Sequence, residues 1–427
     1  MDTIFALASA PGKAGIAVIR ISGSAAISVV EKITHSELNG STPKLRVIYD
    51  LHGNFIDQAL VLVFRAPNSF TGENVAELHL HGSSAVVSSI IELLSNINGL
   101  RLAEAGEFTR RSLNNGKIDL AQVEGLADLI EAETSAQHKQ AARVFSGSLG
   151  RKTKEWRQIL IKAAALLVAT IDFADEEVPE EVTSEVEALI KKVLTELDKE
   201  IVGVQTAERI RAGFEVAIVG APNLGKSTLL NFLAGRDAAI TSDISGTTRD
   251  IIEVKLDLRG LPVTILDTAG IRESVDAIEE VGINRALERS SLCDLRIVLS
   301  EDGKYPPGLV QKETDIVCSA KDDDGKRGGV SGKTGAGVDD LKHTIWTYFI
   351  NLTQDVGIAT RERHRVCMVD AKHFLSNAIV LIKDGPEYYD VTAEEIRAAT
   401  YALDSLIGRI GIENVLDEVF SSFCLGK

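Results

Sequence analysis

The chain has 427 residues, enough for about three domains of ~150 residues each, so a single small module is excluded. It contains 46 Lys and Arg against 62 Asp and Glu, which gives a formal net charge of −16. That balance argues against a protein held to nucleic acid or to an anionic membrane by its overall field. Any contact with RNA would have to come from a local basic patch or from a surface shared with a partner protein.

Hydrophobic residues make up 44% of the chain and charged residues 25%, which is typical of a folded globular protein. The longest apolar stretch, residues 163–171, is far shorter than the ~20 residues that cross a bilayer. The N-terminus has no basic segment before an apolar core, so we expect a cytoplasmic protein without a membrane partner. Four widely spaced cysteines form no CxxC pair and predict neither disulfides nor a local metal site: Cys293, Cys318, Cys367 and Cys424.

Residues 1–116 mix short β-rich runs with Gly, Pro and Asn. Strand patterns cover 16–21 and 60–64, and a helical pattern covers 85–96, so this part is predicted to be an α+β domain.

Residues 117–211 carry apolar residues at three- and four-residue intervals, which predicts long helices with a break at Pro179. The pattern becomes strand-like from Phe214 and helical again at the end of the chain. We therefore predict a discontinuous helical domain, residues 117–211 and 352–427, interrupted by an α/β domain at 212–351.

The inserted domain opens with the apolar run 214–220, which leads into Gly220-Ala-Pro-Asn-Leu-Gly225-Lys226-Ser227 and a helical pattern. In this context G-x-x-x-x-G-K-S is a phosphate-binding loop. Its backbone N–H groups surround the β-phosphate, Lys226 reaches the β and γ oxygens, and the Ser227 hydroxyl binds Mg²⁺. The nucleotide contacts predicted here are Asn223, Leu224, Gly225, Lys226, Ser227 and Thr228.

Two further elements follow at GTPase spacing. In Gly246-Thr-Thr-Arg-Asp250 a threonine can close over the γ-phosphate and Mg²⁺, and Thr248 is assigned to the metal. An alternating hairpin with a Gly-Leu-Pro turn then ends in Asp267-Thr268-Ala269-Gly270, where Asp267 suits a water-mediated Mg²⁺ contact. This spacing predicts a Ras-like GTPase rather than a general ATPase.

The base-recognition segment is Ala320-Lys321-Asp322-Asp323, in which Ala320 replaces the usual Asn of NKxD. Lys321 is expected to stack on the purine and Asp323 to accept the guanine N–H groups, although a solvated acidic turn is the alternative. The later Ser331 and Lys333 are expected to flank the base from the other side. The stretch between strands 296–300 and 315–320 is short for the usual intervening helix.

The residue that orients the attacking water is not fixed by spacing. Ile271 stands directly after the Asp-x-x-Gly glycine, where many small GTPases have a Gln, and it cannot do this work. Asn223 and the run 242–247 could together hold a cation beside the phosphates. The water could be oriented by any of four downstream carboxylates, each of which could equally lie on a solvated helix face: Glu273, Asp276, Glu279 and Glu280.

Residues 2–23, 66–82, 103–130 and the terminal Phe-Cys-Leu-Gly-Lys resemble signatures of the MnmE (TrmE) family of tRNA-modification GTPases. The resemblance covers nearly the whole chain and implies that Glu279 is the catalytic, water-orienting residue. It also implies that a K⁺ ion replaces an arginine finger when two G domains face each other. The K⁺ positions that it implies are Asn223, Ser242, Ile244 and Thr247.

The same resemblance implies that the N-terminal domain dimerises and binds 5,10-methylene- or 5-formyl-tetrahydrofolate. Arg20 and the lysines suit the carboxylates of the folate tail, and Glu77 suits the pterin N–H groups. Cys424 falls near this site, with its chemical role left open. The folate-contacting positions are Arg20, Glu77, Lys117 and Lys427.

The function implied is that of a homodimeric GTP hydrolase that uses Mg²⁺ and K⁺. With an FAD-dependent partner, MnmG (GidA), in a heterotetramer or larger assembly, it would install a carboxymethylaminomethyl-type group at C5 of the tRNA wobble uridine. One alternative is a regulatory or ribosome-assembly GTPase without modification chemistry. Another is a folate-dependent methyltransferase acting alone, which the lack of a GxGxxG fingerprint disfavours.

Overall fold

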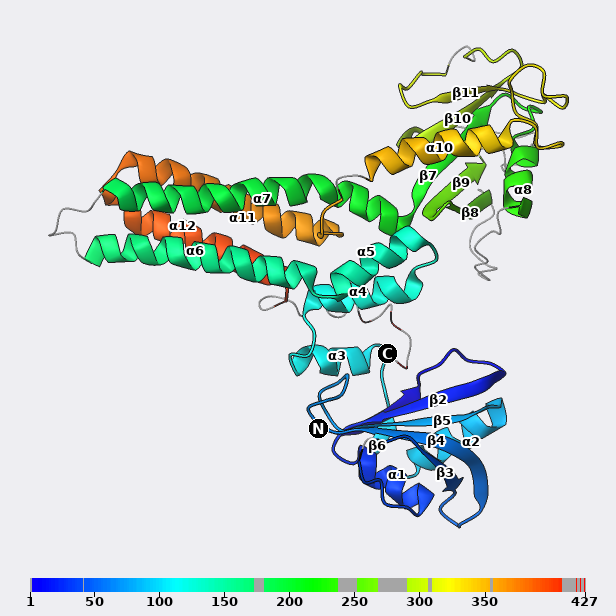
Figure 1. Ribbon diagram of the computed structural model, residues 1–427, viewed down its shortest axis with the longest axis vertical. Helices are drawn as coiled ribbons and strands as arrows, with labels where there is room; N and C mark the ends of the chain where they lie inside the picture. Colours follow the sequence, from blue (N-terminus) through cyan, green and yellow to red (C-terminus); the bar gives the residue numbers. More distant parts are fainter. Residues whose placement is uncertain are drawn as a thin grey trace, which may run out of the picture. The chain divides into compact units, whose positions relative to one another are not determined.

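The computed structural model divides into two compact units, Met1–Ala127 with Asp404–Lys427 and Asp128–Leu403 (Figure 1). None of the described helices combines the length and the apolar content that crossing a membrane requires. The residues that the structure describes are 2–40, 42–172, 180–236, 252–267, 290–305, 309–353, 356–408, 420, 423 and 426.

The first unit contains a six-stranded sheet in the order β3-β4-β5-β2-β1-β6, antiparallel except for the parallel pair β1 and β6. Alternate residues of its strands pack against α1 and α2 on one face and form the core. The α+β prediction and its two strands and helix are confirmed. The bounds are β1 Thr3–Leu7, β2 Ala14–Ser22, β3 Lys44–Tyr49, β4 Phe55–Phe64, β5 Val75–Gly82, β6 Leu100–Leu102, α1 Ala26–Thr34 and α2 Ser84–Ser95.

On the opposite face of this sheet, Phe108 of α3 (Glu107–Asn114) packs against Ile4 and Ala6 of β1. Gly106, just before α3, has a φ of 67°, and a Cβ there would lie 2.7 Å from the Phe420 ring. Only glycine combines that backbone angle with so close an approach. Within the first unit, Phe420 and Phe423 thereby pack against the start of α3.

The second unit contains long antiparallel helices whose apolar residues recur at helical spacing. Trp156 of α6 is fully buried, and its indole N–H donates to Glu196 of α7 at 2.7 Å. Helix α11 lies along α7, so the two helical segments that flank the insert pack together (Figure 1), as predicted. The bounds are α4 Leu120–Glu131, which spans the division between the units, α5 Ser135–Phe145, α6 Ser148–Asp172, α7 Glu180–Ala212, α11 Glu362–Asp384 and α12 Tyr389–Leu406.

The insert is a five-stranded sheet in the order β11-β10-β7-β9-β8, parallel except for β8. The turn between β8 and β9 lies at Arg259 and Gly260, both with positive φ, so the predicted Gly-Leu-Pro turn was wrong and Pro262 belongs to a strand. No helix occurs among the described residues between β10 and β11. The bounds are β7 Phe214–Gly220, β8 Ile252–Leu258, β9 Leu261–Asp267, β10 Leu295–Ser300, β11 Ile316–Ser319, α8 Lys226–Arg236 and α10 Val338–Leu352.

Candidate functional site

The loop between β7 and α8 has the backbone of a phosphate cradle. Asn223 and Gly225 have φ values of 64° and 83°, the left-handed backbone conformation found in loops whose N–H groups bind anions. The Lys226 ammonium donates to the carbonyls of Gly220 at 2.8 Å and Ala221 at 2.9 Å. Burial lowers the pKa of Lys226, and the nearby Asp267 carboxylate opposes that shift. The ammonium is held inside the loop, where phosphate oxygens can replace the two carbonyls.

The predicted magnesium residues Ser227 and Asp267 lie together. Strand β9 pairs with β7, which brings Asp267 level with Ile218 and next to the start of α8. The Ser227 hydroxyl donates to Asp267 Oδ2 at 2.6 Å. A hydroxyl and a carboxylate are hard oxygen ligands of the kind that Mg²⁺ prefers, so this pair fits that ion.

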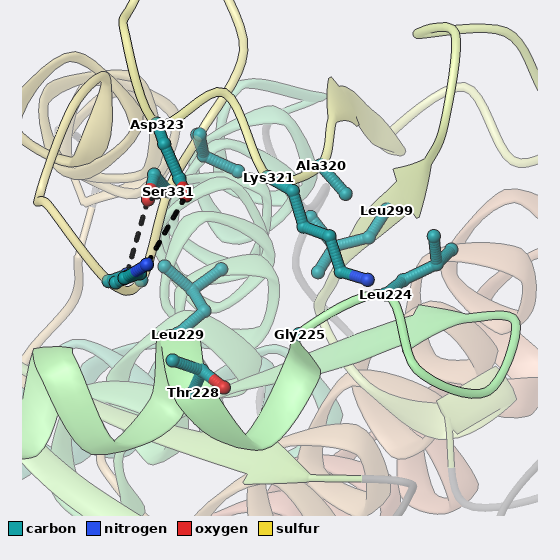
Figure 2. A pocket seen from close by; sticks show the side chains of 12 residues that line it. Leu224, Gly225, Thr228, Leu229, Leu299, Ala320, Lys321, Asp323 and Ser331 are labelled. Carbon is teal, nitrogen blue, oxygen red and sulfur yellow. Dashed lines mark hydrogen bonds and ion pairs between the residues drawn. The ribbon is translucent and has the colours of Figure 1, made fainter.

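A cavity of about 210 Å³ lies where the ends of β10 and β11 meet α8 (Figure 2). Lys321, Asp323, Ser331 and Lys333 all line it, although they come from two loops. The Ser331 hydroxyl donates to Asp323 Oδ1 at 2.7 Å, and the Lys333 ammonium lies 4.0 Å from Oδ2. The structure thus brings the four predicted base-contacting residues around one cavity, adjacent to the phosphate loop through Leu224 and Gly225.

The position of the missing Asn is filled by a small, buried residue. The backbone N–H of Ala320 donates to Ser300, and its methyl group offers no hydrogen bond. Asp322 has a fully buried carboxylate that accepts the backbone N–H groups of Arg327 and Gly329, each at 2.9 Å. These bonds, led by that from Gly329, lower the pKa of Asp322. Asp322 therefore fastens the loop that carries Ser331.

Sequence reasoning did not identify the apolar walls of this cavity. Leu229, Leu299 and Val330 line it, but single apolar residues at the ends of strands and helices look like ordinary core in a sequence. Gly332 also lines it, and a Cβ there would lie 2.4 Å from the Leu229 nitrogen. The loop after Val330 can approach α8 this closely only with glycine.

In the first unit, Arg20 and Glu77 stand directly opposite each other on β2 and β5. Arg20 Nε donates to Glu77 Oε1 at 2.8 Å, and the Arg20 guanidinium lies 5.8 Å and 5.7 Å from the ring centres of Phe70 and Phe108. Both charged residues are partly exposed. They form an ion pair on the sheet face opposite α1 and α2.

Lys117 lies beside the loop that carries Phe70, because a Cβ on Gly72 would be 3.1 Å from Lys117 Cε. A Cβ on Gly426 would be 2.1 Å from the Leu7 carbonyl oxygen, so Gly426 lies against the end of β1. The neighbouring β1 residue, Ala6, is paired with Arg20. Arg20, Glu77, Lys117 and the penultimate residue are thus gathered at one region of the first unit.

The remaining predicted site residues lie outside the described part of the chain: Ser242, Ile244, Thr247, Thr248, Thr268, Ala269, Gly270, Glu279, Cys424 and Lys427.

Family models match both parts of the chain. The model described as GTP-binding protein TrmE N-terminus matches residues 3–117, and that of the MnmE helical domain matches residues 120–424. The chain belongs to the MnmE (TrmE) family. The fold expected for this family, with N-terminal and helical domains and a Ras-like GTP-binding domain, is therefore the fold of this chain.

Relatives named tRNA modification GTPase MnmE are similar over their full length. The proteins of Roseobacter denitrificans, a Ruegeria species and Dinoroseobacter shibae are 56%, 54% and 53% identical, each over 100% of both chains. Among solved structures, Aquifex aeolicus Era bound to GDP·AlF4⁻ is 27% identical over 31% of this chain and 56% of its own. The TM-score of this match is 0.25. Membership in the MnmE family makes this chain one of a family of GTP hydrolases.

Proposed function

We propose that this chain is a cytoplasmic, homodimeric enzyme that hydrolyses GTP with Mg²⁺ and K⁺ and thereby drives modification of the tRNA wobble uridine. With the FAD-dependent partner MnmG (GidA), in a heterotetramer or larger assembly, it adds a carboxymethylaminomethyl-type group at C5. The observation that carries the proposal is the juxtaposition of the phosphate loop with a cavity that holds both Lys321 and Asp323. A tRNA substrate is what the names of its full-length relatives imply.

The chemistry of the nucleotide site follows from its charges. Asp323 accepts the two guanine N–H groups, and Lys321 covers the purine. The φ of Lys321, 53°, turns the backbone at the cavity wall. Lys226 leaves its two carbonyl partners for the β- and γ-phosphate oxygens. Ser227 and Thr248 would hold Mg²⁺, with Asp267 acting through water. When bound, the metal would neutralise charge that develops on the phosphates.

The potassium loop is proposed from the family resemblance, with Asn223 at the turn of the phosphate loop and Ser242, Ile244 and Thr247 as its other members. Glu279 would orient the attacking water. Steady-state GTP hydrolysis in KCl and in NaCl at equal ionic strength tests the loop, and we expect faster turnover in KCl. Equal rates in the two salts would remove the K⁺ assignment.

A Glu279→Ala variant separates hydrolysis from binding. Loss of a general base or water-orienting group lowers the turnover rate by about 100-fold or more, while the affinity for GTP should stay near that of the wild type. Stopped-flow binding of a fluorescent GTP analogue and phosphate release measure the two quantities. Unchanged turnover would exclude Glu279 as the catalytic residue.

The folate site is proposed at Arg20, Glu77, Lys117 and Lys427, with Cys424 nearby. The Arg20–Glu77 pair supports a site that recognises both a carboxylate and N–H donors, because both partners lie partly exposed on the sheet. Folate binding must exchange this pair for contacts with the ligand. Calorimetry with 5-formyl-tetrahydrofolate tests it, and no detectable heat of binding would favour a regulatory GTPase whose N-terminal domain only dimerises.

A further inference from the structure

A second cavity, of about 350 Å³, lies along α5 where this helix meets the β8–β9 turn and the C-terminal half of α10. It shares no lining residue with the nucleotide cavity. Nothing in the nucleotide or folate chemistry uses it.

Three cationic side chains line this cavity. Lys139 and Arg143 are four residues apart on α5, so they lie on the same face of that helix, and Arg259 comes from the turn. All three are exposed, and none of them pairs with a carboxylate among the described residues. The Arg259 guanidinium donates to Nδ1 of His343 at 3.1 Å. Arg143 donates to the carbonyl of Val356 at 3.3 Å.

Carboxylates are missing from the described residues that line the cavity. Glu200 approaches from α7, but its carboxylate accepts the backbone N–H groups of Ile358 at 2.7 Å and Ala359 at 3.4 Å. Asp257, two residues before Arg259, accepts the Gly260 N–H. The lining itself therefore carries three cationic side chains and no carboxylate, in a chain whose formal net charge is −16.

An aromatic group completes the lining. The Arg259 guanidinium lies 5.4 Å from the ring centre of Trp346, and the His343 ring stacks on that indole at 6.0 Å. The indole Nε1–H is buried and has no acceptor among the described residues. Cations interleaved with a partly exposed aromatic ring are the composition of surfaces that bind RNA through phosphates and stacked bases.

The wall that carries the two α5 cations is fixed by hydrogen bonds. The Ala136 N–H donates to the Gly260 carbonyl at 2.9 Å, and Gln137 and Gln140 donate to α7 carbonyls at 3.0 Å and 2.8 Å. A Cβ on Gly260 would lie 2.3 Å from Ser135 Oγ, so the turn and the helix are in close contact. These contacts thus fix the backbone positions from which Lys139, Arg143 and Arg259 extend.

We propose that this cavity binds the sugar-phosphate backbone of RNA, with Lys139, Arg143 and Arg259 on phosphates and Trp346 against a base or ribose. The inference rests on the proposed function for its RNA, a tRNA. The cavity would supply this acidic chain with the local basic surface that binding of tRNA phosphates requires.

The test uses the full-length double variant Lys139→Glu/Arg143→Glu and a labelled tRNA with a wobble uridine, whose binding is followed by fluorescence anisotropy over a series of KCl concentrations. The matched control is Lys154→Glu/Lys199→Glu, which reverses two exposed charges on α6 and α7 outside the cavity. Equal thermal unfolding midpoints of the two variants establish that both are folded. We expect the cavity variant to bind tRNA about tenfold more weakly or worse than the control. The slope of log affinity against log salt should be shallower by about 1 to 2, because a variant that contacts fewer phosphates releases fewer counterions when it binds.

Equal tRNA affinities of the cavity and control variants would overturn the proposal, as would a wild-type chain with no measurable affinity for tRNA. Loss of binding to the flavoprotein partner with tRNA binding intact would also overturn it, since the occupant would then be an acidic protein segment. Wobble modification in complemented cells separates this outcome from failure of the proposed function. If the wild type restores the modification while the cavity variant binds tRNA like the control, the function stands and the cavity assignment fails.

Discussion

The cavity beside the phosphate loop and the Arg20–Glu77 face of the first unit are both lined by charged residues, but they are assembled differently. The cavity takes its polar residues from short runs, 320–323 and 331–333, that follow strand ends. The Arg20 face combines residues from β2, from β5 and from the segment after α3, together with Gly426. The first site is encoded in local motifs, whereas the second depends on strand register and on a distant terminus.

Among the variants considered, Asp323→Asn should have the largest effect, which is a loss of affinity for GTP at the cavity. Losing the carboxylate removes two charge-assisted hydrogen bonds to guanine, each worth about 1.5–3 kcal/mol, so affinity for GTP should fall about 100-fold or more. The amide can instead donate to the extra carbonyl oxygen of xanthine, and XTP binding should rise. Titrations with fluorescent GTP and XTP measure both affinities. Wild-type affinity for GTP in this variant would show that Asp323 belongs to a solvated turn.

In the first unit, Arg20→Ala should weaken 5-formyl-tetrahydrofolate binding by about tenfold or more, because one charge-assisted hydrogen bond to a carboxylate is lost. Calorimetry measures the change. Lys32→Ala is a matched control, since it removes an exposed positive charge from α1, which packs on the opposite face of the sheet. Equal losses in the two variants would mean that net charge, rather than this site, governs folate binding.

A smaller effect on nucleotide binding is expected from Asp322→Ala. The change leaves the N–H groups of Arg327 and Gly329 without their acceptor, at a cost of about 1–3 kcal/mol of stability. The loop that carries Ser331 loosens, so GTP affinity should fall by less than in the Asp323 variant. Thermal unfolding and the same fluorescent GTP titration test this. An unchanged unfolding midpoint would contradict the conclusion that the hydrogen bonds of Asp322 stabilise this loop.

The smallest expected effect is the change with pH in the stability that Asp322 contributes to the folded chain. Because the folded-state pKa of Asp322 is lowered, its stabilisation is fully present above the ordinary value of 3.8 and is lost as pH falls through the folded-state pKa. The difference in unfolding midpoint between the wild type and Asp322→Ala should therefore be constant near neutrality and shrink in acid below pH 3.8. A difference that grows on acidification would contradict the assigned sign.

Much of the fold was predictable from residue patterns, because strand alternation, helical spacing and the G-x-x-x-x-G-K-S loop are local. The hairpin turn was misplaced because Gly260-Leu-Pro resembles a turn, whereas the structure uses positive φ at Arg259 and Gly260. The role of Asp322 was missed because its partners are backbone N–H groups, which leave no signature in the sequence. The pairing of Arg20 with Glu77 depends on a register that neither strand specifies alone.

The most direct test of the account is mass spectrometry of wobble uridine in tRNA from cells that lack this chain. The cells are complemented with the wild type, Asp323→Asn or Arg20→Ala, so that the two sites compared above are each disabled in turn. We predict that the carboxymethylaminomethyl-type group disappears without the chain, returns with the wild type and returns with neither variant. Unaltered wobble uridine modification in cells without the chain would contradict the proposed function.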